Sequence, residues 1–275
     1  MKKQQVIKHI VAWLKNYCDN SGMKGFVVGV SGGIDSALTS TLCAMTKRPV
    51  IVVNVPIHQH KDQYGLASAH INWLKKKFSN VSSQEVKLTG TFLKLLKSLP
   101  AEVRDNHSMA NTRSRLRMLT LYAFSTHHRM LVAGTGNKVE DFGVGFFTKY
   151  GDGGVDISPI ADLMKSEVYA LARELGIIQS ILDAPPVDGL WADNRTDEQQ
   201  IGATYEELEK AMKHRSSKSR APSPKSKGNS RKAEARRLKL TAREKQVLKI
   251  YGRFHKMNEH KMKPIPVCII PAKLK

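Results

Sequence analysis

Cysteine is scarce in this sequence, and its few positions form no metal-binding pattern. The 275 residues include three cysteines, Cys18, Cys43 and Cys268, which lie far apart. Any disulfide scheme leaves one of them unpaired, which argues against a disulfide-stabilised secreted protein. We therefore expect a protein of the reducing cytoplasm.

Long apolar runs are also missing, and no stretch could cross a bilayer. The first residues, Met1-Lys2-Lys3, resemble the start of a signal peptide. The apolar run that follows, from Ile10 to Leu14, is too short for one and lies between Lys8 and Lys15. We expect neither a signal peptide nor contact with a membrane.

Acidic residues are few, because 24 Asp or Glu stand against 45 Lys or Arg, for a formal charge of +21. Residues 213–239 hold eleven Lys or Arg and one acid, Glu234, among Ser, Pro and Gly. That composition is typical of a flexible loop, which we predict over 214–236. Its charge is interpreted mainly as solvated surface, with substrate steering or contact with a polyanion as alternatives.

The stretch from Gly29 to Ser36, Gly-Val-Ser-Gly-Gly-Ile-Asp-Ser, follows an apolar run and opens a helical pattern. Its glycines let backbone N–H groups approach an oxyanion, and a helix N-terminus adds donors, so it predicts a phosphate-binding turn. Asp35 would repel the anion unless it holds a divalent cation such as Mg²⁺. The Walker lysine is missing, so a kinase-type grip on the β- and γ-phosphates is not expected. The alternative is an ordinary turn.

Buried β-branched runs alternate with helical patterns along the chain. This alternation predicts an α/β fold, a doubly wound parallel sheet flanked by helices, in a single domain over 1–275. Ligands should bind where the loops 29–36, 56–63 and 134–140 meet at the strand ends. We predict strands over 26–28, 49–55 and 130–133, a weak strand over 85–88, helices over 3–17, 62–78, 91–98, 108–128, 164–175, 204–213 and 241–259, and an irregular loop over 184–202.

Several polar segments follow these strands or begin helices. Glu140 could be a second Mg²⁺ ligand, and Thr135 could contact a nucleotide; a capped helix start is the alternative. Arg113 and Arg117 share a helix face, which an anionic ligand would favour over a merely solvated basic face. Lys165 lies at a predicted helix start, where a cation opposes the macrodipole unless it faces a phosphate.

The turn resembles the pyrophosphate loop of ATP pyrophosphatases, and the further segments occur in the order found in ammonia-dependent NAD synthetases. The segments are 29–36, 111–118, 134–140, 146–156, Lys165, Leu190-Trp191 with Asp197-Glu198, and His260-Lys261. The resemblance spans nearly the whole chain. It implies an adenine-nucleotide α-hydrolase-like, Rossmann-like fold and a tight homodimer with its substrate site near the subunit interface.

The resemblance also implies roles by position. Mg²⁺ would be held by Asp35 and Glu140, and Asp152 and Lys165 would be catalytic, with Asp152 binding or deprotonating ammonium. ATP would contact Gly29, Val30, Ser31, Gly32, Gly33, Ile34, Asp35, Ser36, Gln59, Thr135, Lys165 and Val187, and deamido-NAD⁺ would contact Arg115, Lys149, Asp152, His260 and Lys261. Two departures from the family are Val187, where Ser or Thr is usual, and Asn54-Val55 before Pro56, where a basic residue is frequent.

The implied reaction is that of a ligase in the final step of NAD biosynthesis, which amidates deamido-NAD⁺ through an acyl-adenylate at the expense of ATP. We expect no glutaminase domain before the turn, since 275 residues leave no room for one, so free ammonia is the expected nitrogen donor; delivery by a separate subunit is the alternative. One alternative is another ATP pyrophosphatase, such as a tRNA-modifying ligase or GMP synthetase. A second alternative is a nucleic-acid-binding protein that uses 213–239, although nucleic acid is not the partner we expect.

Overall fold

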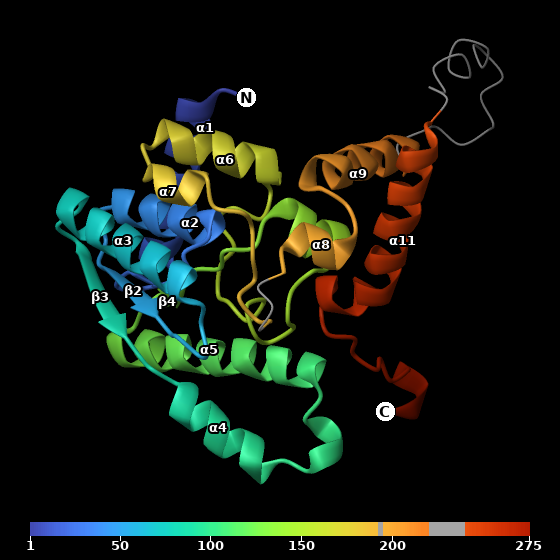
Figure 1. The fold of residues 1–275 in the computed structure, drawn as a ribbon, viewed down its shortest axis with the longest axis horizontal. Helices are drawn as coiled ribbons and strands as arrows, with labels where there is room; N and C mark the ends of the chain where they lie inside the picture. Colours follow the sequence, from blue (N-terminus) through green and yellow to red (C-terminus); the bar gives the residue numbers. More distant parts are fainter. Residues whose placement is uncertain (192–194, 220–239) are drawn as a thin grey trace.

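A computed structural model describes residues 1–191, 195–219 and 240–275 (Figure 1). Its centre is a parallel sheet of four strands in the order β3-β2-β1-β4. Helices cover both faces of this sheet (Figure 1), which confirms the predicted doubly wound α/β fold. The strands are β1 (Phe26–Gly29), β2 (Val50–Asn54), β3 (Val81–Glu85) and β4 (Leu131–Val132).

Successive strand residues point to opposite faces of the sheet and so supply two apolar layers. Val28 and Val52 belong to the larger layer, whereas Val27 and Val53 belong to the smaller layer beneath α5 (Asn106–His128). Near α5 lie α4 (Thr89–Ser98) and the 3₁₀ turn η1 (Ala101–Val103). The larger layer is covered by α1 (Lys3–Asn20), α2 (Ile34–Met45), α3 (Lys61–Lys77), α6 (Lys165–Glu174) and α7 (Gln179–Leu182).

Helix α2 is buried along most of its length although it contains several hydroxyl side chains. Ser40 Oγ donates to the carbonyl of Ser36 at 2.7 Å, and Thr41 Oγ1 donates to that of Ala37 at 2.7 Å. These bonds satisfy the hydroxyls within the helix itself. The helix can therefore pack into the core with its first turn held at the end of β1.

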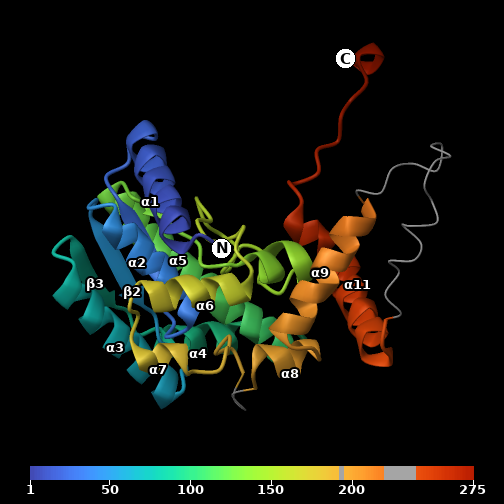
Figure 2. The same cartoon turned by 90° about the horizontal axis from the view of Figure 1, so that it is seen from above.

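A second, smaller core lies beside the sheet (Figure 1). It is formed mainly by the π-helical turn η2 (Val139–Val144) and the paired helices α9 (Tyr205–Ser219) and α11 (Ala242–Met262). After α11 the chain projects away from the body (Figure 2), ends in the 3₁₀ turn η3 (Ala272–Leu274), and leaves Ile269 80% exposed.

Three sequence predictions about element boundaries are wrong. Strand β3 covers Val81–Glu85 rather than 85–88, because all of β2 pairs with this earlier segment. Helix α8 (Asp197–Ile201) interrupts the predicted loop 184–202, because Thr196 and Gln199 form a capping box before it. Helix α9 includes 214–219, and residues 220–236 of the predicted loop lie outside the described residues.

Within the described ranges, no helix has the length and apolar character that spanning a bilayer requires.

Candidate active site

The loops after β1, β2 and β4 meet around a cavity of about 700 Å³ at the carboxyl edge of the sheet. Open parallel sheets bind their ligands at this edge. All of the predicted site residues except Gly32 line the cavity: Gly29, Val30, Ser31, Gly33, Ile34, Asp35, Ser36, Gln59, Arg115, Thr135, Glu140, Lys149, Asp152, Lys165, Val187, His260 and Lys261. The predicted residues thus converge on one cavity, while their individual roles remain predictions.

Hydrogen bonds of its own serines fix the conformation of the turn after β1. Ser36 Oγ donates to the carbonyl of Gly33 at 2.9 Å and accepts the backbone N–H of Ser31 at 3.2 Å. Gly32 has φ +93° and faces α3, where an added Cβ would lie 2.6 Å from the carbonyl of Gln63. The turn therefore presents the N-terminus of α2, with its unpaired helical N–H groups, to the cavity.

Lys165 connects the two predicted magnesium ligands. Its Nζ donates to Asp35 Oδ2 at 2.6 Å and to Glu140 Oε1 at 3.0 Å, and the residue is 3% exposed. Burial acts to lower the pKa of Lys165, but the charges of Asp35 and Glu140 raise it above its ordinary value. The side chain is therefore an ammonium ion at neutral pH, as a role at a phosphate requires.

Asn137, which lies within the segment 134–140, positions both carboxylates. Its Nδ2 donates to Asp35 Oδ1 at 3.1 Å, and its Oδ1 accepts the backbone N–H of Glu140 at 3.2 Å. The residue is fully buried. The Asn137 amide thereby fixes the start of α2 relative to the start of η2. The only feature of the sequence that could have indicated this role is the position of Asn137 between Gly136 and the predicted magnesium ligand Glu140.

Tyr205 and Asp197 lie behind the two carboxylates; Asp197 belongs to a segment of the family resemblance, whereas nothing in the sequence pointed to Tyr205. The hydroxyl of Tyr205 donates to Glu140 Oε1 at 2.5 Å and lies 3.2 Å from Asp197 Oδ2. Oδ1 of Asp197 is buried without a hydrogen-bond partner. Burial, with the charge of Glu140, raises the pKa of Asp197 to about 7. Tyr205 comes from α9, so the smaller core helps to build the site.

The donor set suits Mg²⁺. Among the described residues, no group of three or more His, Cys, Asp or Glu is positioned to hold a metal. Asp35 and Glu140 nevertheless meet beside the phosphate-binding turn, where both contact the same Lys165 Nζ. Mg²⁺ is usually held by one or two carboxylates and completes its coordination with substrate phosphates and water. These two carboxylates would hold it in that way.

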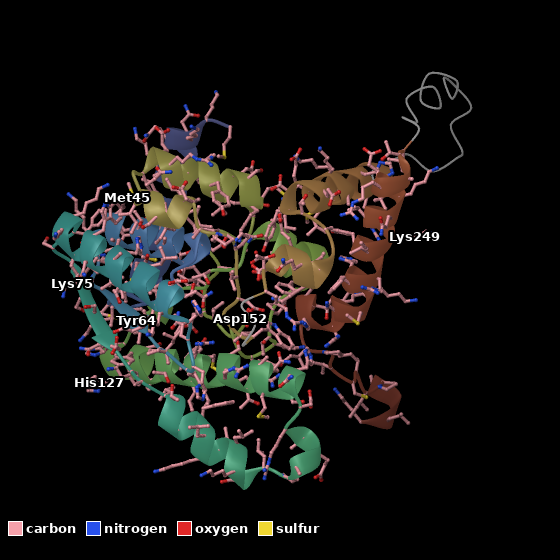
Figure 3. The ribbon with its side chains drawn as sticks, viewed as in Figure 1. Met45, Tyr64, Lys75, His127, Asp152 and Lys249 are labelled. Carbon is pink, nitrogen blue, oxygen red and sulfur yellow. The ribbon has the colours of Figure 1, made fainter. Side chains whose placement is uncertain are left out.

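Asp152 lies near the centre of the molecule, above α5, whereas Lys75, His127 and Lys249 lie at its outer edge (Figure 3). It belongs to the turn that follows the aromatic pair Phe146-Phe147 and lines the cavity. Surrounding protein raises the pKa of the Asp152 carboxyl, although hydrogen bonds to the carboxylate oppose that shift. Lys149, three residues before Asp152, donates instead to the backbone carbonyl of His260.

Two lysines that are predicted to bind the substrate donate hydrogen bonds to backbone carbonyls in this structure. Lys149 Nζ donates to the carbonyl of His260 at 2.8 Å, and Lys261 Nζ donates to those of Gly145 and Phe147 at 3.0 and 2.8 Å. These bonds fasten the Asp152 loop to the end of α11. Arg115 is exposed on α5 and lines the cavity. Their contacts with deamido-NAD⁺ remain predictions.

The three arginines of α5 differ in solvent exposure as their spacing predicts. Arg113 and Arg117 are partly covered, while Arg115 lies on another face and is exposed. Arg117 lines the cavity and its Nε donates to the carbonyl of Val55 at 3.1 Å. Burial first, and then the charge of Arg113, lower the pKa of Arg117 to about 10. Arg117 is thus a cation of the cavity wall, as the predicted anion-facing side of α5 requires, whereas Arg113 of the same face is not among the lining residues.

Gln59 and Val187, two of the predicted ATP contacts, both line the cavity. Gln59 Nε2 donates to the carbonyl of Ser31 at 3.1 Å, so the loop after β2 bonds to the phosphate-binding turn. The carbonyl of Val187 accepts Gln63 Nε2 at 3.5 Å. Val187 can therefore contribute its backbone although it lacks the hydroxyl usual at this position.

Comparison with solved structures confirms the fold. NMN synthetase from Francisella tularensis matches with a TM-score of 0.80, 28% identity and coverage of 99% of each chain. The ammonia-dependent NAD synthetase from Campylobacter jejuni matches with a TM-score of 0.75 over 98% of this chain and 100% of that one, at 24% identity. The second likeness concerns the fold alone.

Comparison of sequences gives the family. The chain is 41% identical to the ammonia-dependent NAD⁺ synthetase of Alkaliphilus metalliredigens over 74% of this chain and 83% of that one. It is 34% identical to the enzyme of the same name from Methanosarcina acetivorans over 78% and 82%. The family model for NAD synthase matches residues 6–264. Together with the phosphate-binding turn and its carboxylates, these matches show that the chain belongs to the NAD synthase family.

Proposed function

We propose that this chain is a ligase that amidates deamido-NAD⁺ with ammonia, converting ATP to AMP and pyrophosphate. The main supporting observation is that Asp35, Glu140 and Lys165 converge beside the phosphate-binding turn at one cavity. A helix N-terminus, two carboxylates and an ammonium group are the groups that a magnesium-bound triphosphate needs. Membership of the NAD synthase family supports the same reaction.

In the first step the nicotinate carboxylate attacks the α-phosphorus of ATP. Pyrophosphate departs, and an acyl-adenylate is formed. Backbone N–H groups at the start of α2 and the ammonium of Lys165 stabilise the negative charge on the departing pyrophosphate. Mg²⁺, when held by Asp35 and Glu140, would neutralise further phosphate charge. In the second step ammonia attacks the acyl carbon, AMP departs, and Asp152 takes up the proton that the nitrogen loses.

A second candidate substrate is nicotinate mononucleotide. The observation that favours it is the likeness to NMN synthetase from Francisella tularensis, whose TM-score of 0.80 exceeds the 0.75 of the Campylobacter jejuni enzyme. The bond formed would be the same pyridine amide. The difference would lie in whether the cavity must also accept the adenylate half of a dinucleotide.

The two substrates are distinguished by a turnover assay with ATP, Mg²⁺ and ammonium chloride. We expect NAD⁺ and AMP in equal amounts from deamido-NAD⁺, and free ammonium rather than glutamine as the nitrogen donor. A kcat/KM at least about tenfold higher for nicotinate mononucleotide would favour the second candidate. Pyrophosphate release that tRNA stimulates, and neither pyridine acid does, would overturn both.

We also propose that the protein is a cytoplasmic homodimer without a nucleic-acid partner. The exposed large apolar residues include Leu93 (40%) of α4, Val103 (42%) of η1 and Leu119 (63%) of α5, and α4 packs against α5. Exposed apolar side chains on neighbouring elements favour a protein interface. Sedimentation should give a dimer, and a monomer at micromolar concentration would contradict this part. Deletion of 220–236 should leave amidation intact.

A further inference from the structure

We propose that Ser114 is a positioning residue for the amidation step, which holds the carboxylate of Asp152 where ammonia attacks. The inference rests on the proposed function, in which Asp152 takes up a proton. Ser114 of helix α5 and Asp152 of the loop that follows η2 are joined by two hydrogen bonds, one in each direction. Neither the sequence pattern nor the resemblance assigned a role to Ser114.

The contact has two hydrogen bonds. Ser114 Oγ donates to Asp152 Oδ1 at 2.7 Å, and the backbone N–H of Asp152 donates to the same Oγ at 2.9 Å. The backbone N–H of Thr148 also donates to Oδ1, at 3.0 Å. Both of the bonds to the carboxylate are accepted by Oδ1, and within the described part of the chain neither involves Oδ2, which is left for a ligand in the cavity.

The position of the serine is itself well determined. Ser114 is 5% exposed and lies three residues after Asn111, on the same face of α5, where Asn111 Oδ1 accepts Thr148 Oγ1 at 2.6 Å. The Asp152 loop is therefore fastened to α5 at two points. Gly151 permits the close approach, because a Cβ there would lie 2.3 Å from Ser114 Oγ.

The serine also influences the charge of Asp152. Surrounding protein raises the pKa of this carboxyl, and the Ser114 hydroxyl gives the largest opposing contribution. Titratable groups on three packed elements act electrostatically on Asp152: Arg117 of α5, Lys261 of α11, and Glu140 and Asp141 of η2. Asp141 has its own pKa raised to about 8, mainly by burial. The Ser114→Ala substitution removes none of these groups, so loss of the serine hydroxyl should raise the pKa of Asp152.

The test is the pH dependence of amidation in Ser114→Ala relative to wild type. Because both proteins receive the same ammonia at each pH, the ratio of their rates removes the titration of ammonium itself. The acidic limb of the variant should move to higher pH by about one unit. The ¹³C signal of the Asp152 carboxyl, assigned by its loss in Asp152→Asn, should show the same shift without reference to activity.

Ser125→Ala is the matched control. Ser125 is another buried serine of α5, 4% exposed, and its hydroxyl donates to the carbonyl of Met130, away from the cavity. This variant should lose stability without any change in the pH profile. Gly151→Ala should reproduce the Ser114→Ala profile, because the new Cβ would displace the Ser114 hydroxyl.

Failure of this inference is distinguishable from failure of the proposed role of Asp152. If Asp152→Asn is inactive and the pH profile of Ser114→Ala matches that of wild type, the inference about Ser114 is overturned while the role of Asp152 stands. An Asp152→Asn variant with wild-type rates would refute the role of Asp152, and the inference with it. Equal shifts in Ser114→Ala and Ser125→Ala would show a general effect of α5 and would also overturn it.

Discussion

The ammonium group of Lys165 lies 2.6 Å from Asp35 Oδ2, and the lysine is 3% exposed. The same group lies 3.0 Å from Glu140 Oε1. A cation from the first turn of α6 therefore neutralises the two carboxylates that are the proposed magnesium ligands. Mg²⁺ and Lys165 would act on the same pair of acids, so the presence of one should change the effect of losing the other.

Replacement of Lys165 by Met should both inactivate and destabilise the protein. The substitution leaves two carboxylates together in a buried site, which costs about 3–5 kcal/mol in the free energy of unfolding. Mg²⁺ should restore part of this stability, and should stabilise the variant more than wild type. Thermal unfolding with Mg²⁺ and with a chelator measures the difference.

Lys138→Met is the control for loss of a lysine ion pair. Lys138 lies 2.6 Å from Asp162, whose side chain is 96% exposed, and exposed pairs contribute about 1 kcal/mol or less. A Lys165→Met variant as stable as this control, or unaffected by Mg²⁺, would contradict the assignment.

Asp35→Asn tests the proposed metal ligand with almost no change of shape. We expect turnover to fall by about two orders of magnitude or more, because Asn cannot supply the anionic oxygen that Mg²⁺ prefers. Asp62→Asn is the control, since Asp62 also occupies the first turn of a helix, α3, but is 81% exposed. Initial rates over a range of Mg²⁺ concentrations check both, and a rate near wild type in Asp35→Asn would refute its role.

Two glycine-to-alanine variants should have opposite effects on stability. Gly32→Ala places a Cβ at φ +93° and 2.6 Å from a carbonyl of α3, so it should destabilise the fold by about 2–4 kcal/mol and weaken ATP binding. Gly65→Ala, within α3, meets no atom within 4 Å and should stabilise by about 0.5–1 kcal/mol. Urea unfolding of both variants is the measurement, and equal effects would count against the account of the turn.

Asp197→Asn should alter how stability depends on pH. Burial raises the pKa of Asp197 to about 7 in the folded protein, above about 3.9 in an unfolded chain. The folded state holds this proton more tightly, so its contribution to stability is complete at low pH and is lost as pH rises from about 4 to about 7. The unfolding free energy of the variant, relative to wild type, should therefore increase from about pH 4 to about pH 7 and stay level above that range. A constant difference would refute the shift.

The sequence by itself determined the fold class, because apolar strand runs and helical periodicity depend on local order along the chain. It also identified the phosphate-binding turn, since glycine and a helix start must be consecutive for backbone N–H groups to meet an anion. Asp35 and Glu140 follow the ends of β1 and β4, and parallel strands bring such ends together. Their proximity could therefore be anticipated.

Only the tertiary structure decided which side chains support these acids. Tyr205 reaches Glu140 across 65 residues, and Ser114 reaches Asp152 across 38, through the packing of helices whose mutual positions no local pattern specifies. The same packing turned Lys149 and Lys261 toward backbone carbonyls. Local sequence fixes backbone direction within an element, whereas contacts between elements arise from the burial of many side chains at once, so only the folded chain specifies them.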